Sequence, residues 1–193
     1  MKVGVLALQG AFDAHVQRLN ALGADVSLVR RACELEGVDG LIMPGGESTT
    51  MLRHLEREQM FDALATFVHT HPCFGTCAGS ILLADTVTPT QRSLGAIPIS
   101  VARNAYGRQL DSTVLLAPSH LGEPPLEMVF IRAPRITQVG EGVEVLAERE
   151  GDPVLVRKGH VLVSTFHPEL SDDTRVHRLF LKMVASSYSA MNI

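Results

Sequence analysis

A cysteine between closely spaced glycines is the residue in this sequence best suited to covalent chemistry. Residues 75–79 read GTCAG, with Cys77 at the centre, between a short apolar run and a helical stretch. This G-x-C-x-G pattern is the cysteine form of the nucleophile elbow, in which only hydrogen fits on either side of the turn. We expect Cys77 to project above the sheet edge, with its thiolate stabilised by the following helix. The motif alone is equally compatible with a buried structural cysteine.

A histidine near the end of the chain can supply the acid and base that a thiolate nucleophile needs. His167 lies in the segment TFHPE, residues 165–169, just after an apolar strand. Pro168 favours an extended backbone at His167, so Glu169 is expected on the same side, two residues further on. Cys77, His167 and Glu169 would then form a catalytic triad. Without a nucleophile, the His-Pro-Glu segment would be better explained as a surface turn with a salt bridge.

The other cysteines and histidines have simpler interpretations. Cys73 lies inside an apolar strand and is assigned to the core, whereas Cys33 lies in a polar loop and is treated as incidental. Solvated or half-buried roles are expected for His15, His54, His69, His71 and His177. No metal-ligand spacing such as H-E-x-x-H occurs, nor a P-loop or a Rossmann glycine motif. We therefore expect neither a metal nor a cofactor.

Apolar strands and helical stretches alternate in the first half of the chain. Strands are expected at 3–8, 26–29 and 40–43 and in the apolar run from Pro72, and residues 81–84 continue the elbow as a helix. Such strand-turn-helix units are typical of a parallel sheet with helices on both faces. Each elbow or loop motif follows a strand, which is where catalytic residues gather in this architecture.

The second half changes character. Short strands at 143–146, 154–156 and 161–165 are separated by turn residues, which favours antiparallel hairpins. A last helix is expected from about residue 174 to 188, with Arg175, Arg178 and Lys182 facing solvent. The expected fold is therefore α/β and flavodoxin-like: an open, mostly parallel sheet with helices on both faces and an antiparallel extension.

Composition agrees with one ordinary folded domain. The chain has 193 residues, of which 46% are hydrophobic and 20% are charged, so we expect a single domain over residues 1–193. The net charge is −4 and basic residues are dispersed, which argues against nucleic-acid binding. The first apolar run is interrupted too early for a signal peptide or membrane span, so a cytoplasmic protein without membrane contact is expected.

Three motifs in order carry a resemblance to a known class of enzymes. With PGGES at 44–48, GTCAG at 75–79 and FHPE at 166–169, the chain resembles the class I, triad-type glutamine amidotransferases over nearly its whole length. Three more segments discriminate within that class: GVLALQG at 4–10, ARNAYGRQ at 102–109 and FIRAP at 130–134. Together they resemble the family of glutaminase subunits of pyridoxal 5′-phosphate synthases.

That resemblance implies an activity and a partner. The chain would hydrolyse L-glutamine to L-glutamate and ammonia through a thioester on Cys77. The ammonia would pass to a separate synthase subunit, which joins it with a pentose phosphate and a triose phosphate to make the vitamin B6 coenzyme. Assembly of the coenzyme would not take place on this chain.

The resemblance also implies the residues of the binding site. Gly46, Glu47 and Ser48 would contact substrate, and so would Arg103, Ile131 and Arg132. The backbone N–H groups of Gly46 and Ala78 would form the oxyanion hole. From the charges of glutamine itself, we expect Arg103 or Arg132 on one side of the pocket and Glu47 on the other. No role is assigned to the segment from Leu115 to Glu127.

Two alternatives share this pattern. The glutaminase subunit of imidazole glycerol phosphate synthase has the same triad and size, and only the segments 103–109 and 130–134 argue against it. A non-catalytic regulatory module could keep the same fold, because fold alone does not prove function. Intact Cys77, His167 and Glu169 argue against the second alternative.

Overall fold

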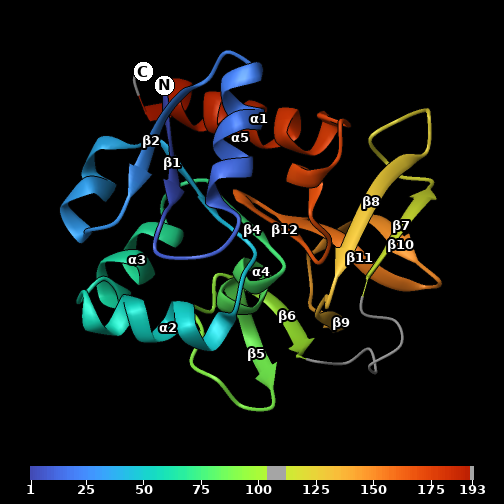
Figure 1. The fold of residues 1–193 in the computed structure, drawn as a ribbon, viewed down its shortest axis with the longest axis horizontal. Helices are drawn as coiled ribbons and strands as arrows, with labels where there is room; N and C mark the ends of the chain where they lie inside the picture. Colours follow the sequence, from blue (N-terminus) through green and yellow to red (C-terminus); the bar gives the residue numbers. More distant parts are fainter. Residues whose placement is uncertain (104–111, 192–193) are drawn as a thin grey trace.

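The computed structural model describes residues 1–103 and 112–191, with a seven-stranded sheet at the centre (Figure 1). The strand order is β10-β11-β12-β4-β3-β1-β2, parallel from β12 to β2, with β10 and β11 antiparallel at one edge. The bounds are β1 Lys2–Leu6, β2 Asp25–Val29, β3 Gly40–Met43, β4 Cys73–Thr76, β10 Glu144–Arg149, β11 Asp152–Lys158 and β12 Val161–Ser164. The α/β prediction with a mostly parallel sheet and an antiparallel extension is confirmed.

Helices cover both faces of this sheet. On one face lie α1 and α5, and on the other lie α2, α3 and α4 (Figure 1). Their bounds are α1 Phe12–Ala21, α2 Ser48–Arg57, α3 Phe61–Val68, α4 Ala78–Leu83 and α5 Arg175–Met191, with two 3-10 helices, η1 Ala32–Gly37 and η2 Pro168–Leu170. None of the helices in the described part of the chain is both long and apolar enough to cross a membrane.

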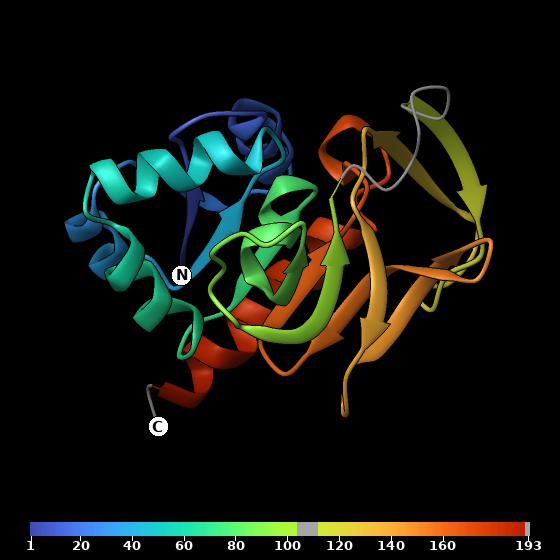
Figure 2. The same cartoon turned by 90° about the horizontal axis from the view of Figure 1, so that it is seen from below.

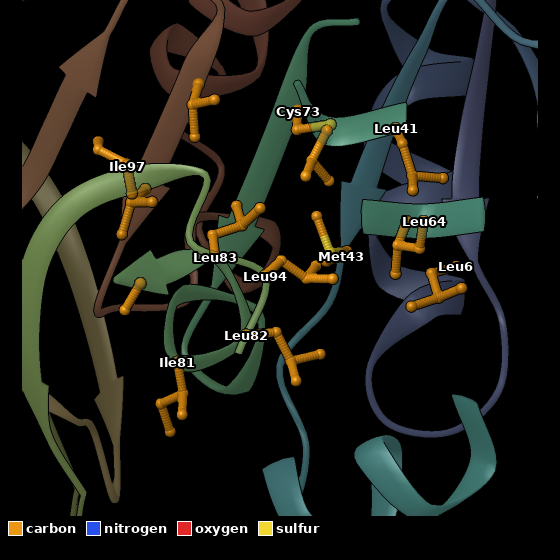
Figure 3. Packing of buried hydrophobic residues seen from close by; sticks show 14 of the residues in the cluster. Leu6, Leu41, Met43, Leu64, Cys73, Ile81, Leu82, Leu83, Leu94 and Ile97 are labelled. Carbon is orange, nitrogen blue, oxygen red and sulfur yellow. The ribbon is translucent and has the colours of Figure 1, made fainter. Parts of the chain in front are cut away.

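The two cores follow from the alternation of side chains along each strand. In β3, Leu41 and Met43 pack under α2, α3 and α4, whereas Ile42 packs under α1 and α5. In β4, Cys73 faces the first core and Phe74 the second. Figure 3 shows the first core, with Leu41, Met43 and Cys73 among its labelled side chains. The assignment of Cys73 to the core is confirmed, and burial raises the pKa of its thiol.

The middle of the chain holds strands that the sequence pattern did not predict. One small sheet has the order β5-β6-β9, and a hairpin joins β7 to β8. These strands are β5 Ala84–Thr88, β6 Ile97–Ala102, β7 Ser112–Ala117, β8 Leu126–Ile131 and β9 Arg135–Val139. In Figure 2 the hairpin lies at the opposite side of the molecule from α2 and α3. The segment of unassigned role therefore spans parts of β7 and β8 and the connection between them.

Three local expectations need correction. The first strand ends at Leu6 rather than residue 8, and Ala84 begins β5 instead of ending the elbow helix. Arg175 does not face solvent freely: its guanidinium pairs with Asp173 at 2.5 Å and also donates to the backbone carbonyl of Pro125. Arg175 thereby ties the start of α5 to the residue before β8.

Candidate active site

Cys77 occupies a strained turn between β4 and α4. Its φ is 47° and its ψ is −103°, a positive φ that residues other than glycine rarely adopt. A Cβ on Gly75 would lie 2.6 Å from the backbone of Gly79, and a Cβ on Gly79 would lie 2.1 Å from the Met43 carbonyl oxygen. The steric prediction for the elbow is therefore confirmed. Cys77 is only 6% exposed, so it lies within a pocket rather than standing free above the sheet.

His167 and Glu169 are joined by a short hydrogen bond. The distance from His167 Nδ1 to Glu169 Oε1 is 2.7 Å, and both residues are buried. The expected reason for this contact was wrong, because residues 168–170 form the 3-10 helix η2 and not an extended segment. The tight turn carries Glu169 back under His167. The backbone N–H of His167 donates to Val129 in β8 at 2.7 Å, which fixes where the turn begins.

The charges around His167 favour its protonated form. Burial alone lowers its pKa, but hydrogen bonds to Cys77 and Glu169, and the charges of both, raise the pKa to about 10. For the carboxyl group of Glu169 burial has the opposite effect and raises the pKa. His15 and His167 outweigh this effect and leave the pKa of Glu169 below its usual value. An ionised Glu169 beside a protonated His167 is the arrangement that holds an imidazolium ready to protonate a leaving group.

Titration of His167 gives a direct test of this electrostatic arrangement. Its pKa rises from 6.5 to about 10 on folding, so its contribution to the free energy of unfolding is fully present below pH 6.5 and disappears as pH rises toward 10. Urea unfolding of the wild type and of His167→Asn should therefore differ more at pH 6.5 than at pH 10. An NMR titration in which the His167 ring loses its proton below pH 6.5 would contradict the assignment.

A pocket of about 370 Å³ opens beside Cys77 and His167. All six positions expected to contact substrate line it, together with Ile81 and Pro134, to which the sequence assigned no role. The six are Gly46, Glu47, Ser48, Arg103, Ile131 and Arg132. Ala78 follows Cys77 directly as the first residue of α4. Residues 104–109 of the ARNAYGRQ segment lie outside the described residues.

Glu47 caps α2 and pairs with Arg103. Its carboxylate accepts the backbone N–H of Thr50 at 2.7 Å and the Thr50 hydroxyl at 2.6 Å. Burial raises the pKa of Glu47, but the hydrogen bonds from Thr49 and Thr50 outweigh it and lower the pKa to about 2. Arg103 lies 3.7 Å from the same carboxylate. The alternative with Arg103 opposite Glu47 is therefore wrong, because the two side chains lie next to each other. The alternative with Arg132 opposite Glu47 stays a prediction.

Sequence comparison assigns the chain to a family. The profile of the family described as "SNO glutamine amidotransferase family" matches residues 5–186. The chain belongs to this family. The resemblance to glutamine amidotransferases is confirmed on this basis. Two of the three segments that discriminate within the class, 102–109 and 130–134, contain residues that line the pocket.

Curated relatives match along nearly their whole length. A protein of Koribacter versatilis named "Pyridoxal 5′-phosphate synthase subunit PdxT" is 58% identical over 190 residues, which are 98% of each chain. The protein of the same name from Thermotoga maritima is 49% identical over 188 residues, covering 95% of this chain and all of the relative. A solved structure described as a glutamine amidotransferase has 45% identity and a TM-score of 0.89, over 95% of this chain and 98% of that one.

A more distant structure shows the fold alone. It is described as a component of a putative GMP synthase from Thermoplasma acidophilum, and it has 19% identity and a TM-score of 0.69 over the full chain. The SNO family fold is thus shared with chains whose sequences have diverged widely. Function must therefore be inferred from the site, not from this likeness.

Two buried histidines behind the triad were missed. His15 and His177 are fully buried, so the expectation of solvated or half-buried roles is wrong for both. His15 Nε2 lies 3.4 Å from Glu169 Oε2, and His15 Nδ1 lies 3.0 Å from His177 Nε2. Helical spacing carried a signal, since His15 is four residues before the buried Leu19 and His177 three before the buried Phe180.

Gly45→Ala should disable the site while leaving the fold largely intact. A Cβ on Gly45 would lie 2.3 Å from His167 Cε1 and 3.3 Å from Cys77 Cβ. The imidazole must shift, and a displacement of about 1 Å at such a site costs on the order of a hundredfold in rate. We expect a loss of that order in steady-state glutamate release. Gly37→Ala is the matched control, because a Cβ there meets nothing within 4 Å, and equal rates for the two variants would contradict the prediction.

Proposed function

We propose that this chain is the glutaminase subunit of a pyridoxal 5′-phosphate synthase, folded as a single glutaminase domain over residues 1–193. The observation that carries the proposal is the cluster formed by Cys77 and the His167–Glu169 pair at one pocket. Relatives named PdxT, up to 58% identical, support the choice of synthase. The substrate is L-glutamine, the products are L-glutamate and ammonia, and the protein partner is the synthase subunit that accepts the ammonia.

The first chemical step uses the thiolate of Cys77. It attacks the side-chain amide carbon of glutamine, which forms the C–S bond and moves an electron pair onto the amide oxygen. Backbone N–H groups of Gly46 and Ala78 stabilise that oxyanion. The His167 imidazolium then gives its proton to the amine, and ammonia leaves as the C–N bond breaks. The product of this half-reaction is a thioester on Cys77.

The second step reverses the role of His167. Now neutral, His167 takes a proton from water, whose oxygen attacks the thioester carbon. Collapse of the new tetrahedral intermediate expels the Cys77 thiolate and releases glutamate. Glu169 keeps the proton of His167 on Nδ1 throughout, so that Nε2 faces the reacting groups. The chain ends the cycle in its starting protonation state.

Charged side chains in the pocket select glutamine. Its α-carboxylate binds Arg132, because Arg103 lies beside Glu47, and its ammonium lies on the side of Glu47. Gly46, Ser48 and Ile131 complete the contacts. Arg132 has a φ of 46°, and such strained backbone is often found at ligand sites. The Arg103–Glu47 pair places a carboxylate and a guanidinium side by side in the pocket lining, where they complement the two charges of an amino acid.

A reconstitution experiment tests the function. The chain is mixed with the synthase subunit of the same organism, and glutamate release is followed together with coenzyme absorbance. Both signals should depend on glutamine. Co-purification with an imidazole glycerol phosphate cyclase instead would favour the alternative synthase. Failure of a glutamine-analogue electrophile to label Cys77 would favour a non-catalytic module.

The isolated chain is expected to be a poor glutaminase. Gly45 and Gly46 have no Cβ, so rotation of their shared peptide costs mainly the hydrogen bond that the Gly45 carbonyl accepts from Ala11 N–H at 3.1 Å. After rotation this loop presents a carbonyl instead of an N–H to the oxyanion site. A hole with one donor forfeits about a hundredfold in rate. Docking of the synthase beside residues 44–48 is proposed to select the active orientation. Steady-state glutamate release with and without the synthase tests this, and equal rates would contradict it.

A further inference from the structure

The buried polar groups behind the triad form a continuous chain that the reaction steps do not use. Glu169 accepts from His167 on Oε1, and its other oxygen, Oε2, faces His15 at 3.4 Å. His15 also lies 3.2 Å from the Thr76 hydroxyl and 3.0 Å from His177. These side chains come from α1, β4, η2 and α5, so four separate elements contribute to one buried network that is centred on His15.

Hydrogen bonding selects one arrangement of protons in this chain. A buried carboxylate needs a donor at each oxygen, and a neutral imidazole has one donor and one acceptor nitrogen. If His177 Nε2–H donates to His15 Nδ1, His15 must carry its proton on Nε2. That nitrogen lies 3.2 Å from the Thr76 hydroxyl and 3.4 Å from Glu169 Oε2. In the opposite arrangement, Glu169 Oε2 would face the lone pair of His15. The first arrangement brings a donor within 3.4 Å of a carboxylate oxygen that has no hydrogen bond in the structure, and the second brings a lone pair there instead.

Both histidines are kept neutral. Burial lowers the pKa of His15 although Glu169 opposes this, and burial lowers the pKa of His177 to about 3. Two other charged groups lie near this network. The charge of His167 also lowers the pKa of His15. Arg18 donates from Nε to the Glu169 backbone carbonyl at 3.2 Å and pairs with Asp172 at 2.9 Å. A neutral His15 therefore lies beside the ionised Glu169 carboxylate, with Nε2 at 3.4 Å from Oε2.

We propose that His15 is a positioning residue that holds Glu169 through Nε2–H, and that His177 fixes the tautomer of His15. Glu169 in turn orients His167, so the effect of His15 on the reaction passes through two hydrogen bonds. This inference rests on the proposed glutaminase function. It adds to the triad a neutral donor contributed by α1, which lies more than a hundred residues earlier in the chain.

Paired variants at His15 separate positioning from packing. His15→Leu removes the donor, and we expect kcat for glutamine to fall about tenfold with KM little changed, since outer partners of functional histidines typically contribute 10- to 100-fold. The acid limb of the kcat/KM profile should move to higher pH, because Glu169 loses a donor to its charged form. His15→Gln can keep an N–H near the same place and should recover most of kcat. Phe180→Leu, which removes only apolar packing in α5, should leave kcat and the pH profile unchanged.

The assays use the complex with the synthase subunit, and the wild type is measured beside Cys77→Ala. Unchanged kcat and acid limb in a folded His15→Leu would overturn the inference. Should that variant fail to fold, ¹⁵N NMR of wild-type His15 decides: a proton on Nε2 supports the inference and a proton on Nδ1 overturns it. Absence of glutamine hydrolysis by the wild-type complex would instead refute the proposed function, and the NMR result would still stand on its own.

Discussion

Cys77→Ala and Cys77→Ser each lower glutamine hydrolysis by about 10⁴-fold or more, since loss of a catalytic nucleophile can cost as much as about 10⁶-fold. The alanine variant has no atom to form the thioester, and the serine hydroxyl is a far weaker nucleophile than a thiolate. Neither change disturbs the turn, because the glycines that permit it remain and only one buried atom is removed or exchanged. The loss is measured as glutamate release in the presence of the synthase.

Two controls make this expectation specific to Cys77. Cys33→Ser should keep full activity, because Cys33 is exposed in η1 and does not line the pocket. Ammonium added to the Cys77→Ala complex should restore coenzyme formation, since only the supply of ammonia is lost. Substantial glutamate release by either Cys77 variant would remove the nucleophile assignment.

His167→Asn is expected to be nearly as damaging as loss of Cys77, while Glu169→Gln leaves measurable activity. Asparagine cannot move a proton to the leaving amine or from water, so both halves of the reaction fail. Glutamine at position 169 still fills the site between His167 and His15. The glutamine amide has an NH₂ group in place of one acceptor oxygen. That NH₂ group must face either His167 Nδ1 or His15 Nε2. The residual rate should therefore exceed that of His167→Asn by at least about tenfold.

The order of the two effects is the decisive measurement. Rates of glutamate release are compared at one pH with thermal unfolding of each variant, so that loss of fold is separated from loss of chemistry. Thr165→Val is a matched control, because it changes a buried polar residue beside the same turn without touching the triad. Equal and mild effects of His167→Asn and Glu169→Gln would indicate a structural His-Pro-Glu turn instead.

Sequence spacing was informative where the constraint was local and steric. The elbow could be predicted because Gly75 and Gly79 lie two residues from Cys77 and their contacts arise within the turn and its neighbouring strand. The β-α alternation of the first half was also readable, since each strand carries side chains for both cores. By contrast, β5 to β9 pair across loops, and short apolar runs alone do not say which strands meet.

Electrostatic contacts were predicted less well than steric ones. Glu47 was expected to contact substrate. Its carboxylate also accepts hydrogen bonds from Thr49 and Thr50 and pairs with Arg103, and the sequence predicted none of these contacts. Arg175 was expected in solvent but joins α5 to neighbouring loops. Charged side chains are long, and their partners depend on the packing of elements that lie far apart in the sequence.

The amino-acid sequence by itself predicted the elbow around Cys77 and the α/β class, because each is set by neighbouring residues or by a periodic pattern. The pocket-lining segments were predicted only from the family resemblance. Only the tertiary structure decided which side chains lie next to Glu169 on the side away from His167. His15 and His177 are separated by 162 residues and meet because α1 and α5 pack on the same face of the sheet. Helical spacing predicts that each histidine faces the core. It does not predict that the two histidines contact each other, because that contact depends on how α1 and α5 pack.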